Sequence, residues 1–467
     1  VGLTGRSFIP LLSSFACAIP GIMGTRAITD PRDRLATILV APLMDALQSA
    51  VTWAGSLASS RLPDGPGKAL ITDGIFKGVG AVVVFVPQIA LLFMFLSILE
   101  DSGYLARAAF LMDRLLSKVG LHGKSFIPLL SSFACAIPGI MATRTIESRR
   151  DRLATILIAP FMSCSARLPV YTLLIGTFFA GLGAFAQAGI MLACYALGIL
   201  AAVGTAIIFK RTFLKGMPSS FILEMPTYKV PQLSTVARQV WSNASEFLKK
   251  AGTIIFALSV VLWALAYYPR LPKAKADQVE AVVQRDYATN SYRDWEHLLT
   301  GQKERLEYSE DAFVKNRVAA AQSEYSFAGR FGHALAPVIR PLGYNWKMGV
   351  GLVAAFAARE VFVSTESIVY ATGDTEDTAS GGGGTAPLSQ ALRADRRPDG
   401  TPVWTPLVAI SLLVWFVLAM QCMSTVAIVR RETGGWGWPI FMILYMNGLA
   451  YVACLVVYQV GTHVLGV

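Results

Sequence analysis

Long apolar runs separated by short polar segments fill most of the chain. Runs near membrane-spanning length cover 79–99, 184–209, 251–268, 407–420 with its flanks, and 439–460. A helix of roughly 20 residues crosses the ~30 Å hydrocarbon core of a bilayer. The runs do not alternate with a period of two, and irregular backbone cannot face lipid, so they predict helices and not a barrel. We therefore expect an all-α polytopic membrane protein with roughly eight to ten transmembrane helices.

Composition and charge support a membrane location. The chain is 54% hydrophobic and only 15% charged, with a mean hydropathy of +0.52. Its net charge of +11 comes largely from basic residues beside apolar runs, such as Lys210-Arg211 and Arg430-Arg431. This positive-inside pattern predicts a membrane lipid partner and no nucleic acid. The six cysteines lie in apolar surroundings, which argues against a disulfide framework.

The polar segments divide the chain into two halves. Residues 45–209 form the first predicted transmembrane half and 329–467 the second. Between them, 210–250 has three prolines and ends in Lys249-Lys250, which predicts a cytoplasmic connector. Residues 251–269 then form a transmembrane helix that leads to an extracytoplasmic polar region, 270–328. The glycine-rich segment 373–400 is expected to be a flexible loop.

Residues 1–44 nearly repeat residues 119–162. The two blocks align without gaps and differ at 9 of 44 positions, so 35 are identical. Internal repeats of transporters are ancient and weak in sequence, so this block indicates a recent partial duplication or an artefact. The chain starts at Val1 without a signal-peptide pattern, and we expect a fragment or a processed form. We place the working site in the second copy.

Two proline-containing segments combine thiols with other polar groups at membrane depth. Cys135 lies three residues before Pro138, which removes a backbone donor and frees a carbonyl upstream. Cys164 lies between Ser163 and Ser165, and Arg167 follows. Transporters use broken helices of this kind to coordinate ions. The alternative is a proline kink with a thiol that acts as a small hydrophobe, and for the Cys135 segment alone that alternative is favoured.

Charged residues within or beside the apolar runs are further candidates. Glu100 and Asp101 end one run, as an interfacial pair or as a mouth that attracts cations. Arg359, Glu360 and Glu366 lie in another run, where ionisable groups need a partner or a function. Arg144, Arg167, Arg359 and Glu360 are expected to hold structure by pairing or by binding backbone, because bare arginines do not suit a cation path.

The cysteines point to a particular class of metal. Cys135, Cys164 and Cys422 each lie near Ser or Thr in or at the end of an apolar run. Sulfur ligands select transition metals over magnesium or calcium. If these thiols converge, the candidate metal site comprises Cys135, Cys164, Cys422, Ser163, Ser165 and Glu366. Gly123-Lys124-Ser125 lacks the earlier glycine of a phosphate loop, so we expect no GTP binding by this chain.

Several longer motifs resemble the membrane part of the FeoB-type ferrous iron transporters. They are ILEDSGYLAR at 98–107, GKSFIP at 123–128, MATR at 141–144, RDR at 150–152, PFMSCSARLPVY at 160–171, ARE at 358–360 and RRETG at 430–434. The resemblance covers about 45–467. It implies inward Fe²⁺ transport through two gate-like halves, with Cys135, Cys164 and Cys422 at the family's intramembrane cysteines.

The resemblance also implies partners and a location. It implies a GTPase domain upstream that couples or gates transport, so GTP acts only through that domain. Small Feo-type accessory proteins, a homo-oligomer and the bacterial cytoplasmic (inner) membrane are expected with it. The chain departs from the family's Gly-Phe-Gly-Cys-Asn-Val-Pro at 132–138, which reads SFACAIP and lacks the asparagine oxygen. Glu366 stands where the family more often has an apolar residue.

Two other classes of function remain open. The chain would fit a transporter of another divalent metal, such as Mn²⁺ or Zn²⁺, or of a nucleoside. It would also fit a membrane scaffold or sensor that binds metal without moving it. Competition in uptake assays separates the substrates, and flux into vesicles separates a transporter from a scaffold.

The charge pattern predicts the topology. Lys249-Lys250 marks an inner helix end, so 210–250 should face the cytoplasm and 270–328 the outside. A single cysteine at position 300 should therefore react with an impermeant thiol reagent added to whole cells. Labelling of that position only from the cytoplasmic side would reverse the assignment.

Overall fold

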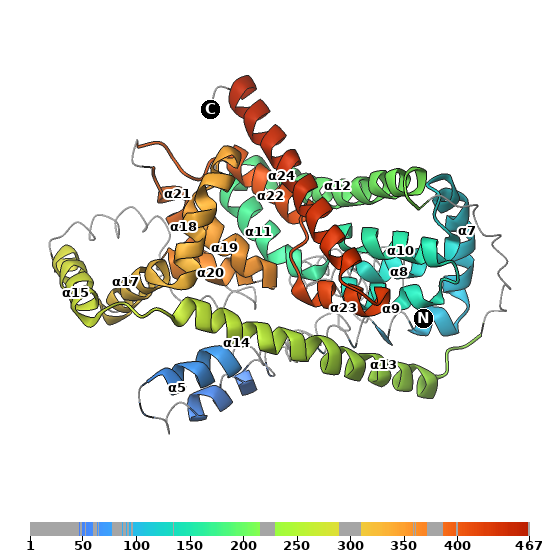
Figure 1. Ribbon diagram of the computed structural model, residues 1–467, viewed down its shortest axis with the longest axis horizontal. Coiled ribbons are helices and arrows are strands. Elements are labelled where there is room, and N and C mark those ends of the chain that lie inside the picture. The colour runs from blue at the N-terminus through green and yellow to red at the C-terminus, as the bar shows by residue number, and fades with distance from the viewer. Residues whose placement is uncertain are drawn as a thin grey trace.

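The fold is described here from a computed structural model (Figure 1). It describes residues 97–133, 135–214, 229–288, 310–357, 359, 361–370, 386–397 and 400–465, with short stretches between 46 and 94. The near-duplicate block 1–44, Glu360, residues 371–385 and the side chain of Ser165 lie outside the described residues. The flexible loop expected over 373–400 is wrong in part, because α21 (Ala386–Ala394) is a helix.

The described part of the chain is helical, and its only bridge pairs Arg396 with Pro402. The first half contains α5 (Pro66–Ala69), η1 (Leu70–Phe76), α7 (Tyr104–Lys118), η2 (Gly123–Ser125), α8 (Phe126–Ser132), α9 (Ala136–Ala142), η3 (Thr143–Thr145), α10 (Arg149–Ile158), η4 (Ala159–Phe161), η5 (Ser165–Arg167), α11 (Leu168–Phe178), η6 (Ala180–Leu182) and α12 (Gly183–Arg211). The helical fold expected from the apolar runs is confirmed.

The middle of the chain follows as one long helix and a hairpin. The long helix comprises α13 (Leu233–Phe247), η7 (Leu248–Gly252) and α14 (Thr253–Tyr267), without a break. It therefore runs through the expected boundary between the connector and the transmembrane helix. The hairpin comprises α15 (Lys273–Ala288) and α17 (Glu310–Tyr325). Figure 1 shows this hairpin and α7 at opposite ends of the longest axis.

The second half packs against the first around one buried helix. It contains α18 (Phe327–Ile339), η8 (Arg340–Leu342), α19 (Trp346–Ala357), α20 (Val361–Val369), α21 (Ala386–Ala394), α22 (Pro406–Leu418), α23 (Met423–Thr433) and α24 (Gly437–Leu465). Helix α22 contacts α24 on one side and α11 and α12 on another. Its side chains are buried along most of its length, so it forms the centre of the packed core.

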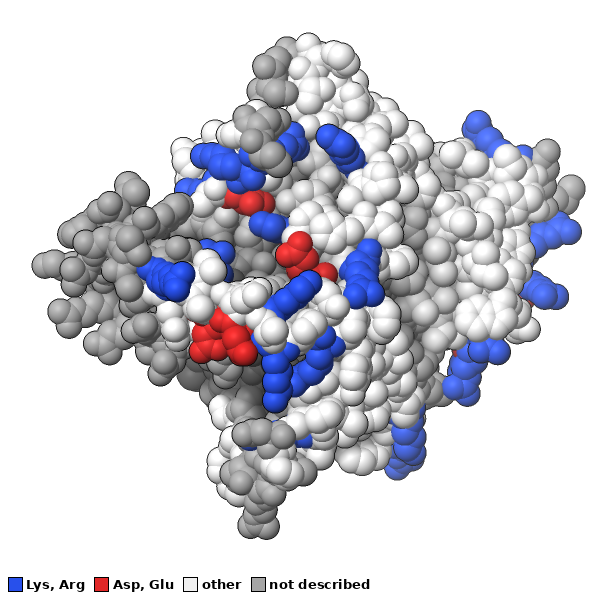
Figure 2. Space-filling model, turned by 60° about the vertical axis from the view of Figure 1, so that its left-hand side comes forward, with Lys and Arg blue, Asp and Glu red and all other residues white. Residues whose placement is uncertain are grey.

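Three helical segments are long and apolar enough to cross a membrane within the described residues. They are Ala180–Arg211, Pro406–Thr433 and Gly437–His463. Figure 2 shows a wide surface without charged side chains and with Lys and Arg along its border, as expected where lipid covers a protein. The total of eight to ten spans stays a prediction.

A glycine lets α8 and α9 pack closely beside the break that separates them. A Cβ on Gly139 would lie 1.9 Å from Ser132 Oγ and 2.7 Å from the carbonyl oxygen of Pro128. Ser132 Oγ also donates a hydrogen bond to that carbonyl at 2.8 Å. The space at Gly139 is therefore already filled by hydrogen-bonded atoms that cannot move away independently.

Gly139→Ala should destabilise the protein by ~1–3 kcal/mol, the usual cost of overpacking a core. Thermal unfolding of the purified protein in detergent measures this. Gly176→Ala in α11 is the matched control, since nothing lies within 4 Å of the added methyl group. Equal melting temperatures for the Gly139→Ala variant and the parent would contradict the packing described here.

Candidate functional site

The three predicted site cysteines all lie where a helix is interrupted. Cys135 directly precedes α9 with extended backbone (φ −155°, ψ 134°). Cys422 directly precedes α23 with nearly the same conformation (φ −163°, ψ 103°). Cys164 lies in the unwound stretch between η4 and η5. Each thiol thus marks the start of a short helix inside the protein.

Cys135 and Cys422 lie at corresponding ends of two adjacent helices. Helices α9 and α23 pack together. Arg144, nine residues after Cys135 (135 to 144), donates hydrogen bonds from Nε to both carboxylate oxygens of Glu432 at 3.0 Å. Glu432 is ten residues after Cys422 (422 to 432). Since a helix rises ~1.5 Å per residue, the two thiols lie at a similar distance, ~14 Å, from this ion pair.

Arg359 brings Cys164 to the break between α22 and α23. Its guanidinium is 4% exposed and donates hydrogen bonds to the carbonyls of Gln421 at 3.1 Å and Ala419 at 3.2 Å. Its Nη1 also lies 3.5 Å from Cys164 Sγ. Cys422 directly follows Gln421, whose carbonyl Arg359 binds. These three side chains therefore form one local group that joins the two halves of the chain.

The other freed carbonyls are also bound by side chains. Arg167 is fully buried and donates to the carbonyls of Pro160 at 2.8 Å and Phe161 at 3.1 Å, and to Ser163 Oγ at 3.4 Å. Asn447 of α24 lies 3.5 Å from the carbonyl of Met420. Buried carbonyls without partners are costly. Arg167, Arg359 and Asn447 therefore stabilise the unwound segments.

Glu366 lies on α20 beside α19. A Cβ on Gly351 of α19 would lie 2.3 Å from the Oε1 of Glu366. Its carboxylate is buried with no hydrogen-bond partner among the described residues. Lys347 and Asp395 pair with each other at 3.0 Å. No described hydrogen bond joins Glu366 to the cysteines, and its place in the metal site stays a prediction.

Within the described residues, no group of three or more His, Cys, Asp and Glu side chains is arranged to hold a metal ion. Cys164 and Cys422 are brought together with Arg359, and Ser163 lies beside Arg167 on the same unwound stretch. Cys135 is related to Cys422 only by its similar distance from the ion pair of Arg144 and Glu432. Two of the three predicted sulfur ligands thus belong to one local group, and Cys135 is not part of it.

The acidic pair before α7 has a structural contact. Asp101 Oδ2 accepts a hydrogen bond from the backbone nitrogen of Gln232 at 2.7 Å, whereas Glu100 is exposed. Gln232 directly precedes α13, in the segment predicted to face the cytoplasm. With a cytoplasmic connector, the predicted cation-attracting mouth at Glu100 and Asp101 would lie on the cytoplasmic side.

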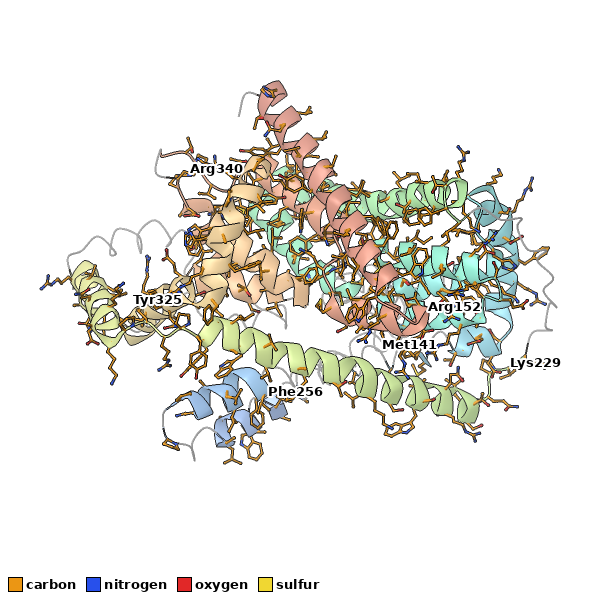
Figure 3. The ribbon with its side chains drawn as sticks, in the orientation of Figure 1. Met141, Arg152, Lys229, Phe256, Tyr325 and Arg340 are labelled. Carbon is orange, nitrogen blue, oxygen red and sulfur yellow. The ribbon has the colours of Figure 1, made fainter. Side chains whose placement is uncertain are left out.

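Two residues of this region, Glu432 and Asn447, were not identified from the sequence. Glu432 was noted only within a motif, yet its carboxylate is 3% exposed and bound by Arg144 and by Arg152, at 2.7 Å. Figure 3 labels Met141 of α9 and Arg152 of α10, which lie at the same end of the molecule. Asn447 carried a signal that was overlooked, because a lone amide within a long apolar run needs a partner.

Comparison with known proteins agrees with this architecture. Residues 82–178 and 248–436 match the Gate family, described as "Nucleoside recognition", and together these exceed half of the chain. Residues 191–243, between them, match the family described as "Ferrous iron transport protein B C terminus". This chain belongs to the FeoB family. It carries the family's membrane region, with the two Gate segments contributing α9 and α23.

The FeoB relatives are similar over nearly the whole chain. The "Fe(2+) transporter FeoB" of Leptospira interrogans is 42% identical over 421 residues, 89% of this chain and 54% of its own length. The Staphylococcus aureus transporter of the same name is 39% identical over 84% of this chain and 49% of its own length. A Porphyromonas gingivalis "Fe(2+) transport protein A/Fe(2+) transporter FeoB fusion protein" is 42% identical over 90% and 47%. The chain spans about half the length of these relatives. No solved structure matches it.

Arg359→Lys should destabilise the FeoB membrane region by ~2–4 kcal/mol. Lysine keeps the charge but cannot reproduce the fork that binds two carbonyls, so a buried carbonyl loses its partner. Thermal unfolding is the measurement. Arg340→Lys, at an exposed position far from Arg152 in Figure 3, is the control. A loss no greater than the control's would show that Arg359 does not stabilise the break.

Proposed function

We propose that this chain is the membrane pathway through which Fe²⁺ enters the cell. The observation that carries the proposal is the group formed by Cys164, Cys422 and Arg359, at a helix break between the two halves. The match to the FeoB C-terminal family and the names of the relatives support iron as the substrate. The description of the Gate family mentions nucleosides, but no described group favours that substrate over a metal.

The chemistry of the site fits a borderline metal ion that binds only briefly. Thiolates bind Fe²⁺ in preference to Mg²⁺ or Ca²⁺, which favour oxygen. Cys164 and Cys422 are the proposed ligands, with Cys135 approaching from the facing helix break. Ser163 adds a hydroxyl oxygen nearby, and Ser165 stays a candidate from the sequence. An ion in transit must be able to leave, so an incomplete ligand set serves conduction better than a closed cage.

Arg359 adjusts the charge of this site. Its guanidinium stands beside Cys164 and offsets the negative charge that a thiolate brings into an apolar interior. The same positive charge repels a bound metal ion and so shortens its stay. Glu366 remains a further candidate ligand, since its buried carboxylate has no hydrogen-bond partner among the described residues.

The surroundings of the pathway follow the family. We propose that a GTPase domain outside this chain gates transport, that the protein lies in the bacterial inner membrane as a multi-pass protein, and that it assembles as a homo-oligomer. The fusion named for the Porphyromonas relative supports an accessory Feo-type partner. With a cytoplasmic connector, Glu100 and Asp101 lie at the inner end of the path, where they would receive the ion.

The double variant Cys135→Ser, Cys164→Ser tests the thiol ligands. Serine keeps the size and an oxygen but lacks the polarizable sulfur, so we expect Fe²⁺ uptake to fall by about tenfold and the preference for Fe²⁺ over Mg²⁺ to weaken. Uptake into cells or vesicles under reducing conditions, normalised to folded protein, is the measurement. Cys→Ala at either position should reduce flux further.

Cys194→Ser and Cys454→Ser serve as matched controls for this experiment. Both thiols are buried within the unbroken helices α12 and α24, so their loss should leave selectivity unchanged. Selectivity of the double variant equal to the parent's would exclude the thiols as ligands. Absence of Fe²⁺ flux in the parent, with metal still bound, would instead favour a scaffold or sensor.

A further inference from the structure

Glu432 is the most heavily bound carboxylate that the proposed pathway leaves unused. Both of its oxygens accept hydrogen bonds from Arg144, and Oε2 also accepts one from Arg152 at 2.7 Å. The Nη2 of Arg152 reaches the backbone carbonyl of Glu432 as well, at 3.3 Å. One carboxylate thus connects α23 with the residues after α9 and with α10.

These bonds join parts of the chain that are far apart in sequence. Arg144 and Arg152 belong to the first Gate segment and Glu432 to the second, at separations of 288 and 280 residues. The hydrogen bond to Glu432 raises the pKa of Arg144, so this arginine remains charged. The contact is therefore an ionic link between the two halves.

The two helices that meet here are short and can move as units. α9 has 7 residues and α23 has 11. Each begins at a cysteine whose backbone is extended and so departs from helical geometry, which allows it to act as a hinge. Each reaches the ionic link about one helix length later. Movement at the link therefore changes the separation of α9 and α23 along their whole length, including at Cys135 and Cys422.

The exposure of the link suits reversible opening. The side chain of Glu432 is 3% exposed, but those of Arg144 and Arg152 are 47% and 29% exposed. When the link opens, both arginines are already in contact with water and regain hydration easily.

We infer that Glu432, held by Arg144 and Arg152, is the closing bond of an inner gate between α9 and α23. The exposed arginines around it (Arg149, Arg150, Arg430 and Arg431) place this end at the cytoplasmic face by the positive-inside rule. The gate separates the cysteine level from the cytoplasm until the link breaks. This inference rests on the proposed function, because it assigns the gate to an ion path.

Thiol accessibility tests the gate without any transport measurement. In a full chain whose only cysteine is Cys422, Glu432→Gln keeps the size of the side chain and removes its charge. Labelling of Cys422 by an impermeant reagent, added to the cytoplasmic side of inside-out vesicles, should accelerate roughly tenfold, as expected for loss of a charge-assisted pair.

Glu147→Gln is the matched control for this variant. It removes the charge of a carboxylate that pairs with Lys124 at 2.8 Å within the first half, so the labelling rate should equal the parent's. A Glu432→Gln rate equal to that of Glu147→Gln would overturn the gate. Failure of the proposed iron transport would leave the labelling result unaffected, so the two ideas can fail separately.

A reversible cross-link separates gating from simple stabilisation. Arg144→Cys with Glu432→Cys, in a chain that lacks Cys17, Cys194 and Cys454, can be joined by a short reducible thiol reagent. Fe²⁺ uptake should stop when the link is formed and return on reduction. Lys124→Cys with Glu147→Cys, a pair within one half, is the control and should transport whether linked or not. Uptake that persists through the cross-linked 144–432 pair would overturn the proposal.

Discussion

A helix that ends inside a membrane leaves carbonyl groups without partners, and in this protein buried donors bind them. Water is absent from the hydrocarbon region, so an unpaired carbonyl there has no solvent to bind it and destabilises the protein. Arg167 binds two such carbonyls beside η4, and Arg359 binds two at the end of α22. Without these contacts, the chain could not remain unwound at the positions that carry Cys164 and Cys422.

This arrangement explains how positive charge could lie beside the proposed cation path. The guanidinium groups donate hydrogen bonds to backbone oxygen atoms, which reduces their electrostatic field in the surrounding space. Arg359 still has one nitrogen directed at Cys164, so the thiol and the helix break share a single donor. The position of the Cys164 thiol and the backbone geometry of the break therefore depend on each other. A shift of either one moves Arg359 and so displaces the other.

Local features of the site were predictable from the sequence, and its long-range contacts were not. Apolar run lengths indicated helices, and Cys164 with Arg167 stood out because an arginine at that depth needs compensation. The partners of Arg359 and Glu432 lie tens to hundreds of residues away, and no periodicity encodes such a distance. Glu366 was grouped with the cysteines because all are rare in apolar runs, whereas its packing against Gly351 of α19 has no signal in the sequence. Asp101 was assigned to a mouth from its place at a run's end, whereas its contact with Gln232 depends on where α13 begins.

Helix α24 is longer than the hydrocarbon core of a bilayer is thick. Its 29 residues measure ~43 Å, whereas the hydrocarbon core is ~30 Å. The helix must tilt or project to match that core, and Figure 1 shows it crossing α12 obliquely. Its Asn447 lies against Met420 at the unwound end of α22. A thinner or thicker membrane changes the preferred tilt of α24, so hydrophobic mismatch acts directly on the segment that holds Cys422.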